Sequence, residues 1–389
     1  MEACAALGGV TVLDFSSVGP AARCARILAD YGATVVKVGA PRRAGAVQIE
    51  PPFHAYAGGR GMKRVRVDLK AEAGRAAVLR LAAGADVVIE SFRPGVASRL
   101  GVGYDDVRRV NDRIVYCSTS GYGQQGDRAR WAGHDLDYLA VGGFLHMSGR
   151  RADGGPALPG ATIADAAAGG MHAAIAILSA LVRRGATGRG ACLDVSVADG
   201  VVSLMALAVD QHLATGEDPA PGGDLLSGRY ACYDVYEAGD GKWLAVAAIE
   251  PAFWANLCRE LGLDRWTSRQ LDDAAQDAIR ADLRAAFAAR PRDEWTRRLA
   301  AADTCVAPVL SVAELADDSQ LAARGAFVRA EHPERGSFRQ LAPLLAGSVR
   351  EPGPVALRGQ DETDTFELLR AAGLGATEIE RLQQEGVIA

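Results

Sequence analysis

The stretch VTVLDFSSVGPAARCARILADYGATVVKV, residues 10–38, decides the fold, because two β-branched runs flank a segment of helical length. The runs VTVLDF and TVVKV have the length and composition of buried strands. The segment between them is long enough for a helix that connects one strand to the next. This order of strand, helix and strand predicts a βαβ unit with parallel strands.

The same alternation continues to about residue 120. Two further strand-like runs, DVVIE at 86–90 and RIVYCS at 113–118, alternate with helical stretches. The first turn carries Gly19 and Pro20 where a dinucleotide-binding fold would need GxGxxG. We therefore predict the α/β class, with a large Rossmann-like parallel sheet that does not bind NAD.

The length of the chain predicts more than one domain. Its 389 residues exceed the roughly 250–300 residues at which a single hydrophobic core stops growing. The Gly- and Pro-rich segment GEDPAPGGD at 216–224 indicates a linker. The expected organisation is a large α/β domain over 1–215, a linker over 216–228, a smaller α+β domain over 229–325, and a tail over 326–389 that returns to the large domain.

Several elements are predicted within these domains. The apolar stretch DAAAGGMHAAIAILSALVRR, residues 165–184, predicts a buried helix that stops at Gly185. The stretch YACYDVYEAGDGKWLAVAA, residues 230–248, predicts a hairpin with a Gly-Asp-Gly turn. Amphipathic helices are expected near 250–261 and over 280–302.

Composition excludes several functional classes. The net charge is -5, and its 43 basic and 48 acidic residues are mixed along the chain, so we expect neither a nucleic-acid partner nor a membrane partner. Seven cysteines without CxxC spacing indicate reduced core thiols. No signal-peptide pattern opens the chain, so we expect a cytoplasmic protein. The six histidines show no ligand spacing, so no metal site is expected.

Three polar residues stand out, although each has an ordinary structural explanation. His134 in AGHDLDYLA follows a Gly-rich loop at an apparent helix start, where backbone N–H groups can stabilise an oxyanion. Asp165 precedes an apolar helix, where aspartate usually acts as an N-cap. Glu250 directly precedes Pro251 and can simply begin the next helix. Taken singly, each of the three is explained by structure alone.

Their surroundings together resemble the family III CoA-transferase superfamily, over residues 9 to about 375. Nine ordered segments carry the resemblance: VLDFSSVGPAARCARILADYGATVVKV (12–38), VDLK (67–70), ESFRPGVASRLGVGY (90–104), STSGYGQQG (118–126), GHDLDYLA (133–140), ADAAAGGM (164–171), TGRGACLDVSVADG (187–200), YDVYEAGDGKWLAVAAIEP (233–251) and DTCVAPVLSVAEL (303–315). The turn VGPAARCA and Asp127 in QQGD depart from the usual pattern.

The resemblance implies a fold and a substrate. It implies an interlocked homodimer of the family III CoA-transferase fold and an acyl-CoA thioester substrate, so that CoA is part of the substrate and no separate cofactor is needed. It points to Lys37 and Arg93 as partners of CoA, and arginine suits bidentate binding of phosphate. Either residue can instead be a solvated surface charge.

Within the superfamily, the sequence resembles the α-methylacyl-CoA racemases. Transferases and racemases both have an aspartate where Asp165 stands, but His134 in the GHD segment and Glu250 in the AIEP segment are typical of racemases. The resemblance implies that His134 and Asp165 are two bases that interconvert (R)- and (S)-2-methylacyl-CoA through an enolate. Glu250 would hydrogen-bond to His134, and the main-chain N–H of Asp135 would receive the enolate oxygen.

Two alternatives stay open at this point. In a family III CoA-transferase, Asp165 would form an aspartyl-CoA thioester while CoA moves from an acyl-CoA to a carboxylic acid. In a non-catalytic CoA-binding protein, the fold and Arg93 would bind the ligand without turnover. The identity of the acyl group does not follow from the sequence.

Overall fold

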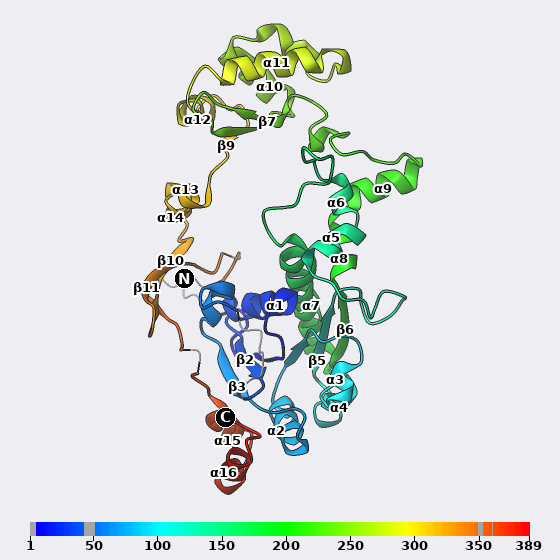
Figure 1. Ribbon diagram of the computed structural model, residues 1–389, viewed down its shortest axis with the longest axis vertical. Coiled ribbons are helices and arrows are strands. Elements are labelled where there is room, and N and C mark those ends of the chain that lie inside the picture. The colour runs from blue at the N-terminus through cyan, green and yellow to red at the C-terminus, as the bar shows by residue number, and fades with distance from the viewer. Residues whose placement is uncertain (1–4, 43–50, 345, 349–352, 360) are drawn as a thin grey trace. The chain divides into compact units, whose positions relative to one another are not determined.

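The computed structural model describes residues 5–42, 51–344, 346–348, 353–359 and 361–389. These residues form two compact units, each built from segments that are not contiguous in sequence. The larger unit contains residues 1–144, 159–206 and 319–389, and the smaller contains residues 145–158 and 207–318. Each unit has its own sheet and its own hydrophobic core (Figure 1).

The larger unit is organised around a six-stranded parallel sheet with the order β3-β2-β1-β4-β5-β6. Its strands are β1 (Thr11–Asp14), β2 (Thr34–Gly39), β3 (Lys63–Arg66), β4 (Val87–Glu90), β5 (Val115–Ser120) and β6 (Ala191–Ser196). The strand order reverses between β1 and β4, which is where ligands bind in open α/β sheets. The structure therefore confirms the predicted large parallel sheet.

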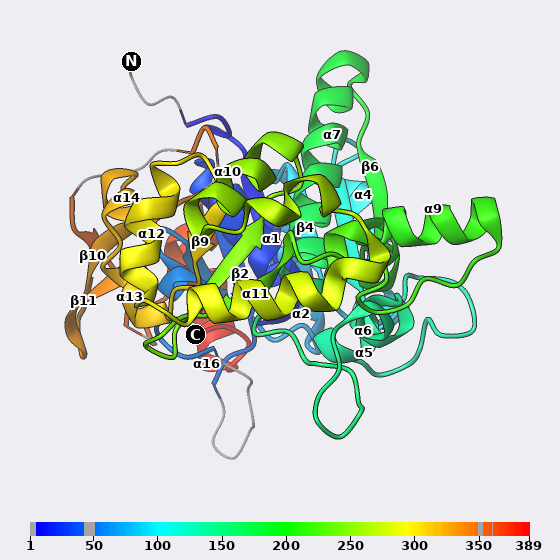
Figure 2. The ribbon, with the colours of Figure 1, turned by 90° about the horizontal axis from the view of Figure 1, so that it is seen from above.

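Helices cover both faces of this sheet. One face packs on α1 (Gly19–Asp30) and α7 (His172–Thr187) through a core that includes Leu28 and Ile177. Helix α7 packs against β5 and β6, and both views show it next to β6 (Figures 1 and 2). The other face packs on α2 (Glu72–Ala83), α4 (Tyr104–Val110), α15 (Thr365–Ala371) and α16 (Ala376–Gln384). The remaining helices of this unit are α3 (Val96–Arg99), α5 (Asp135–Val141), a π-helix (Ala164–Met171), α8 (Val197–Leu204), α14 (Ser319–Ala323) and a 3-10 turn (Ala55–Gly59).

The C-terminal segment is part of the larger unit. It contributes a small sheet of β10 (Phe327–His332), β11 (Gly336–Leu341) and β12 (Val355–Ala356). The backbone N–H of Asp68 donates to the carbonyl of Val387, and the N–H of Arg66 donates to Oγ1 of Thr365. These bonds tie the last two helices to the edge strand β3.

The smaller unit is α+β, as expected. Its antiparallel sheet has the order β7-β8-β9, with β7 (Tyr233–Glu237), β8 (Trp243–Ala247) and β9 (Val306–Pro308). The predicted hairpin is confirmed, since β7 and β8 pair directly. Trp254, Phe287 and Leu257 fill the core beneath α10 (Pro251–Leu261), α11 (Gln276–Phe287) and α12 (Arg292–Ala300). This unit also contains α9 (Ala206–Thr215, whose first residue belongs to the larger unit), α13 (Val312–Ala316) and 3-10 turns at Leu225–Ser227, Asp264–Arg269 and Asp273–Ala275; α6 (Phe144–Met147) begins at the boundary.

Several predictions about single elements were wrong. Strand β3 was missed, because KRVR has only one apolar residue and is paired through its backbone. The helix expected to stop at Gly185 continues to Thr187, and Gly188 ends it with φ of 72°. The helix expected over 280–302 is two helices, which Pro291 separates. Cys192 and Cys305 are exposed and are not core thiols.

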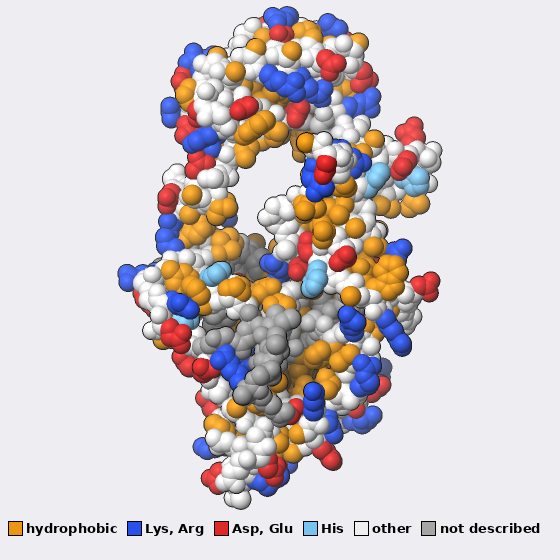
Figure 3. All heavy atoms as spheres, in the orientation of Figure 1, with side chains coloured by type: hydrophobic (Ala, Val, Ile, Leu, Met, Phe, Trp, Pro, Cys, Tyr) orange, Lys and Arg blue, Asp and Glu red, His pale blue; other side chains and the backbone are white. Residues whose placement is uncertain are grey.

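The helix Ala164–Thr187 is long and apolar enough to cross a membrane by length and composition. A bent pair, α8 with α9, passes the same test only when taken as one span. However, Ala173, Ala174 and Ile177 of α7 belong to the core beside the sheet. On the face shown in Figure 3, charged side chains of both signs are mixed, in line with the composition.

Candidate active site

Asp165 lies in the π-helix, where close packing fixes its position. An added Cβ at Gly169 would lie 2.4 Å from Cβ of Pro20, at the start of α1. An added Cβ at Gly200 of α8 would lie 2.1 Å from the carbonyl oxygen of Ala168. The small residues in ADAAAGGM therefore let α1 and α8 approach the π-helix closely. This packing holds Asp165 against the start of α1.

Asp165 does not have the capping role that its sequence position suggests. The residue before the π-helix, Ile163, is already helical. Instead, the backbone N–H of Asp165 donates a 2.8 Å hydrogen bond to Oδ1 of Asp135. This bond brings the first residue of α5 to the π-helix and so brings together two of the predicted site residues.

His134 directly precedes α5. Its backbone is extended, with φ of -126° and ψ of 179°, and its backbone N–H donates to Oδ2 of Asp137 at 2.9 Å. The imidazole side chain is exposed, whereas Asp135 and Asp165 are half-buried. As the first residue of α5, Asp135 has a backbone N–H with no acceptor inside the helix. The structure thus gathers a base, a carboxylate and a main-chain donor at one place.

The surroundings of Asp165 disfavour its ionised form. Burial is the largest cause that raises the pKa of Asp165, and the carboxylate of Asp135 raises it further. Arg23 and His134 act in the opposite direction and lower this pKa. A carboxyl group held in this way accepts a proton more readily than an ordinary aspartate does.

Arg23 was missed by sequence reasoning. It lies on α1 one turn after Gly19, and its Nη2 donates to Oγ1 of Thr162, which precedes the π-helix. It is one of two arginines, with Arg26, in an otherwise mostly apolar helix. No spacing rule connects that position to Asp165.

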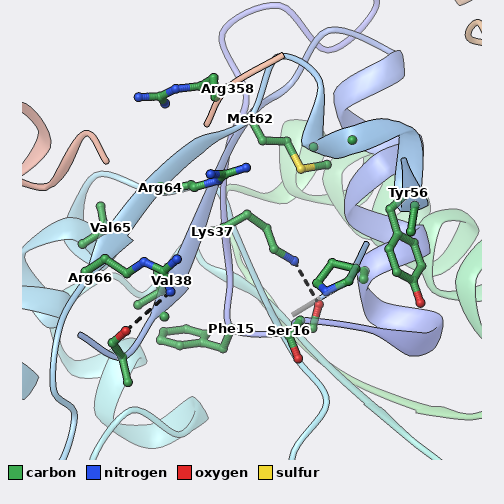
Figure 4. A pocket seen from close by; sticks show the side chains of 18 of the residues that line it. Phe15, Ser16, Lys37, Val38, Tyr56, Met62, Arg64, Val65, Arg66 and Arg358 are labelled. Atoms are coloured by element: carbon green, nitrogen blue, oxygen red, sulfur yellow. Dashed lines mark hydrogen bonds between the residues drawn. The ribbon is translucent and has the colours of Figure 1, made fainter. Parts of the chain in front are cut away.

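A cavity of about 850 Å³ opens at the ends of β1, β2 and β3 within the larger unit. Cations that line it come from several elements: Lys37, Arg64, Arg66, Lys70, Arg335 and Arg358. Figure 4 shows Arg64, Arg66 and Arg358 at one end and Ser16 and Tyr56 at the other. A pocket of this size and charge suits a ligand that carries several phosphates.

Lys37 lines this cavity, but its ammonium group has a carboxylate partner. Nζ of Lys37 lies 2.5 Å from Oδ2 of Asp14, and the side chain of Asp14 is 0% exposed. The backbone N–H of Ser16 donates to Oδ1 of the same carboxylate. Lys37 therefore neutralises a buried charge, which limits how far it can serve a phosphate.

Arg93 and Glu250 are not among the residues that line this cavity. Arg93 is exposed in the loop after β4, although its neighbour Phe92 lines the cavity. Glu250 belongs to the smaller unit, where it is exposed and directly precedes α10, as a helix-starting residue would. Its pairing with His134 stays a prediction.

Among the described residues, no group of three His, Cys, Asp or Glu side chains is placed to hold a metal ion.

Comparison with known proteins gives a consistent result. The sequence model described as CoA-transferase family III matches residues 7–358. The chain is 34% identical to the alpha-methylacyl-CoA racemase of Homo sapiens, over 98% of this chain and 97% of that protein. It is 31% identical to the acetyl-CoA:oxalate CoA-transferase of Acetobacter aceti, over 91% and 90%. The crystal structure of a CAIB/BAIF family protein from Brucella suis superposes with a TM-score of 0.74 and 28% identity, over 94% and 98%.

Proposed function

Since this chain belongs to CoA-transferase family III, we propose that it is an α-methylacyl-CoA racemase that interconverts (R)- and (S)-2-methylacyl-CoA. The observation that carries the proposal is the hydrogen bond from Asp165 to Asp135, because it joins the helix that follows His134 to a second acid–base group. Both groups are needed when a proton leaves one face of a carbon and returns to the other.

The proposed chemistry is a two-base transfer. The thioester carbonyl acidifies the α C–H bond, and the neutral imidazole of His134 takes the proton. The electron pair of the C–H bond moves to the carbonyl oxygen and gives an enolate. The protonated carboxyl of Asp165 then donates its proton to the opposite face of the α-carbon. The opposite enantiomer reacts with the two roles exchanged.

This scheme requires Asp165 to hold a proton while His134 is neutral. The raised pKa of Asp165, which burial and then Asp135 cause, supports that protonation state. The N–H of Asp135 is proposed to donate to the enolate oxygen, since it lies at the start of α5 without an intrahelical acceptor. Glu250 is proposed to orient the imidazole of His134, because it lies in the AIEP segment whose glutamate is typical of racemases.

The cavity in the larger unit supports CoA as the common part of the substrate. Its cationic side chains Arg64, Arg66, Lys70 and Arg335 suit the phosphates of CoA, whereas Arg358 forms ion pairs with Asp364 and Glu362. The acyl group would extend toward the Ser16 and Tyr56 end, next to the start of α1. The proposal thus assigns CoA binding to more residues than Lys37 and Arg93.

CoA transfer to a carboxylic acid is the second candidate. The identity with the oxalate CoA-transferase supports it, and Asp165 carries the carboxylate that would attack the thioester. The two functions differ in their intermediates: racemisation passes through an enolate and exchanges the α-proton with solvent, whereas transfer passes through an aspartyl-CoA thioester. Hydroxylamine would trap that thioester at Asp165 during transfer and would leave the racemase unmodified.

We also propose that the chain forms a homodimer. Ile175 and Val182 on α7 are 62% and 78% exposed, and Leu207 and Leu213 on α9 are 78% and 75% exposed. Apolar side chains this open to water are typical of a surface that a second subunit covers. Light scattering coupled to gel filtration should give twice the mass of one chain.

A further inference from the structure

The segment that precedes β3 has an uncommon backbone. Tyr56 and Ala57 have φ of 48° and 54°, and Gly58 and Gly59 follow with φ of 63° and 64°. Four consecutive residues are therefore left-handed, which costs about 1–2 kcal/mol for each residue that carries a Cβ. Strain of this kind persists where neighbouring contacts over-determine it, and it clusters at functional sites.

The contacts of Tyr56 identify what holds this turn. Its phenol oxygen accepts a 2.9 Å hydrogen bond from the backbone N–H of Gly19, at the start of α1. Gly19 adjoins the candidate active site, since an added Cβ there would lie 4.0 Å from Oδ2 of Asp165. The turn thus delivers the Tyr56 hydroxyl to the neighbourhood of the catalytic carboxyl.

Arg23 fixes the ring of Tyr56. Its guanidinium carbon lies 5.4 Å from the centre of the ring, and its Nη2 donates to Thr162, one turn before Asp165. The ring therefore packs against an arginine of α1 that is itself held by Thr162. Tyr56 also lines the cationic cavity, opposite Arg64 and Arg66 (Figure 4). Tyr56 therefore lines the cavity and also contacts Gly19 and Arg23, two residues close to Asp165.

We propose that Tyr56 is a further catalytic residue whose hydroxyl donates a hydrogen bond to the thioester carbonyl oxygen of the acyl-CoA. The inference rests on the proposed function, because it assumes that an acyl-CoA occupies the cavity. A tyrosine hydroxyl has one proton to donate besides its acceptor sites. The Gly19 N–H occupies an acceptor site, so the proton of Tyr56 remains for the substrate. The proton stays on the phenol throughout, and the two-base transfer is unchanged.

The decisive variant is Tyr56→Phe, which keeps the ring and removes the donor. A preorganised donor to a developing oxyanion contributes about 10²–10³ in kcat. We expect kcat for α-proton exchange to fall at least about 10-fold, while KM and the Kd for CoA stay within about 3-fold. The matched control is Tyr31→Phe at the other end of α1, where the hydroxyl donates to the carbonyl of Ala346. It should leave kcat within about 2-fold of the unmodified enzyme.

Two results would overturn the inference. One is a kcat for Tyr56→Phe within 2-fold of the unmodified enzyme, and the other is a rise in KM and Kd with kcat unchanged. If Tyr56→Phe does not fold, 3-fluorotyrosine at position 56 retains the ring and gives a more acidic hydroxyl. The rate should then change with donor acidity, and an unchanged rate and pH profile would contradict the role.

Failure of the proposed function is distinguishable from failure of this inference. If the unmodified enzyme exchanges no α-proton but transfers CoA to oxalate or acetate, the racemase assignment fails. The thioester oxygen also gains charge during attack by Asp165, so Tyr56→Phe should slow transfer by the same factor. An unchanged transfer rate in that variant would then overturn the role of Tyr56.

Discussion

The backbone N–H of Asp165 and the side chain of Asp135 form a 2.8 Å hydrogen bond across 30 residues of sequence. The bond joins the π-helix to the start of α5, and His134 directly precedes that helix. Two carboxyl groups therefore share one site, and the carboxylate of Asp135 disfavours ionisation of Asp165.

The pH dependence of exchange should report the influence of Asp135. Burial and then Asp135 raise the pKa of Asp165, so Asp135→Asn should lower that pKa. In the direction where Asp165 is the base, the exchange rate falls at acid pH as Asp165 becomes protonated. In Asp135→Asn this acid limb of the pH–rate profile should move to lower pH. The exposed Asp127→Asn is the control and should leave the limb in place. A limb that does not move in Asp135→Asn would contradict the coupling.

The same raised pKa affects stability. Because the pKa of Asp165 is raised in the folded state, the folded protein binds this proton more tightly than the unfolded chain does. The free energy of unfolding should therefore fall as the pH rises from the ordinary aspartate pKa through the raised pKa of Asp165. Asp165→Asn should therefore unfold at a higher urea concentration than the unmodified protein at pH 7, with the difference vanishing near pH 3. Chemical unfolding at the two pH values measures this.

Lys37 should matter more for stability than for CoA. Lys37→Met leaves the buried carboxylate of Asp14 without its cation, at a cost of about 3–5 kcal/mol in the free energy of unfolding. Lys63→Met removes an exposed pair with Glu367 and should cost less than about 1 kcal/mol. Adding Asp14→Asn to Lys37→Met should recover part of the loss. Equal unfolding midpoints for the two single variants would refute the structural role.

CoA affinity should depend on cations that line the cavity. Lys70→Ala and Arg335→Ala should each weaken CoA binding about 3- to 10-fold, more strongly at low ionic strength. Lys63 lies on strand β3 nearby but does not line the cavity, so Lys63→Ala should bind CoA normally. Calorimetric titration at two salt concentrations tests this. Arg93→Ala in the same titration decides whether the loop after β4 also contacts CoA.

We expect the close packing of α8 against the π-helix that carries Asp165 to leave no room for a side chain at Gly200. An alanine at this position would place its Cβ 2.1 Å from a backbone oxygen, and no rotation of a side chain can relieve that clash. Gly200→Ala should therefore lower the free energy of unfolding by about 1–3 kcal/mol and slow α-proton exchange. Gly185 on α7 has no atom within 4 Å of an added Cβ. Gly185→Ala should stabilise by about 0.5–1 kcal/mol. Thermal unfolding of both variants provides the comparison.

The sequence predicted the parallel sheet because its strands are apolar runs of the right length. It missed β3, since KRVR pairs through its backbone and shows little apolar pattern. The sequence shows Pro291, but the amphipathic spacing on both sides of it favoured one continuous helix, so the break between α11 and α12 was not predicted. Local pattern thus located most elements but not the edge strand.

The site was less predictable, because its key contacts join distant segments. His134, Asp135 and Asp165 were proposed from their motifs, but the Asp135–Asp165 bond depends on how α5 meets the π-helix. Lys37 lines the cavity, as a CoA-binding residue would, but its ion pair with the buried Asp14 could not be predicted from the sequence. Arg23 and Tyr56 carry no motif, and their relation to Asp165 is visible only in three dimensions.

The most direct test of the racemase proposal is deuterium incorporation at the α-carbon of (R)- and (S)-2-methylacyl-CoA in heavy water, followed by NMR. The unmodified enzyme should exchange the α-proton of both enantiomers with inversion, and His134→Ala and Asp165→Ala should slow exchange by at least about 100-fold. The absence of exchange, together with passage of CoA to an added carboxylic acid only when Asp165 is intact, would contradict racemisation and establish CoA transfer instead.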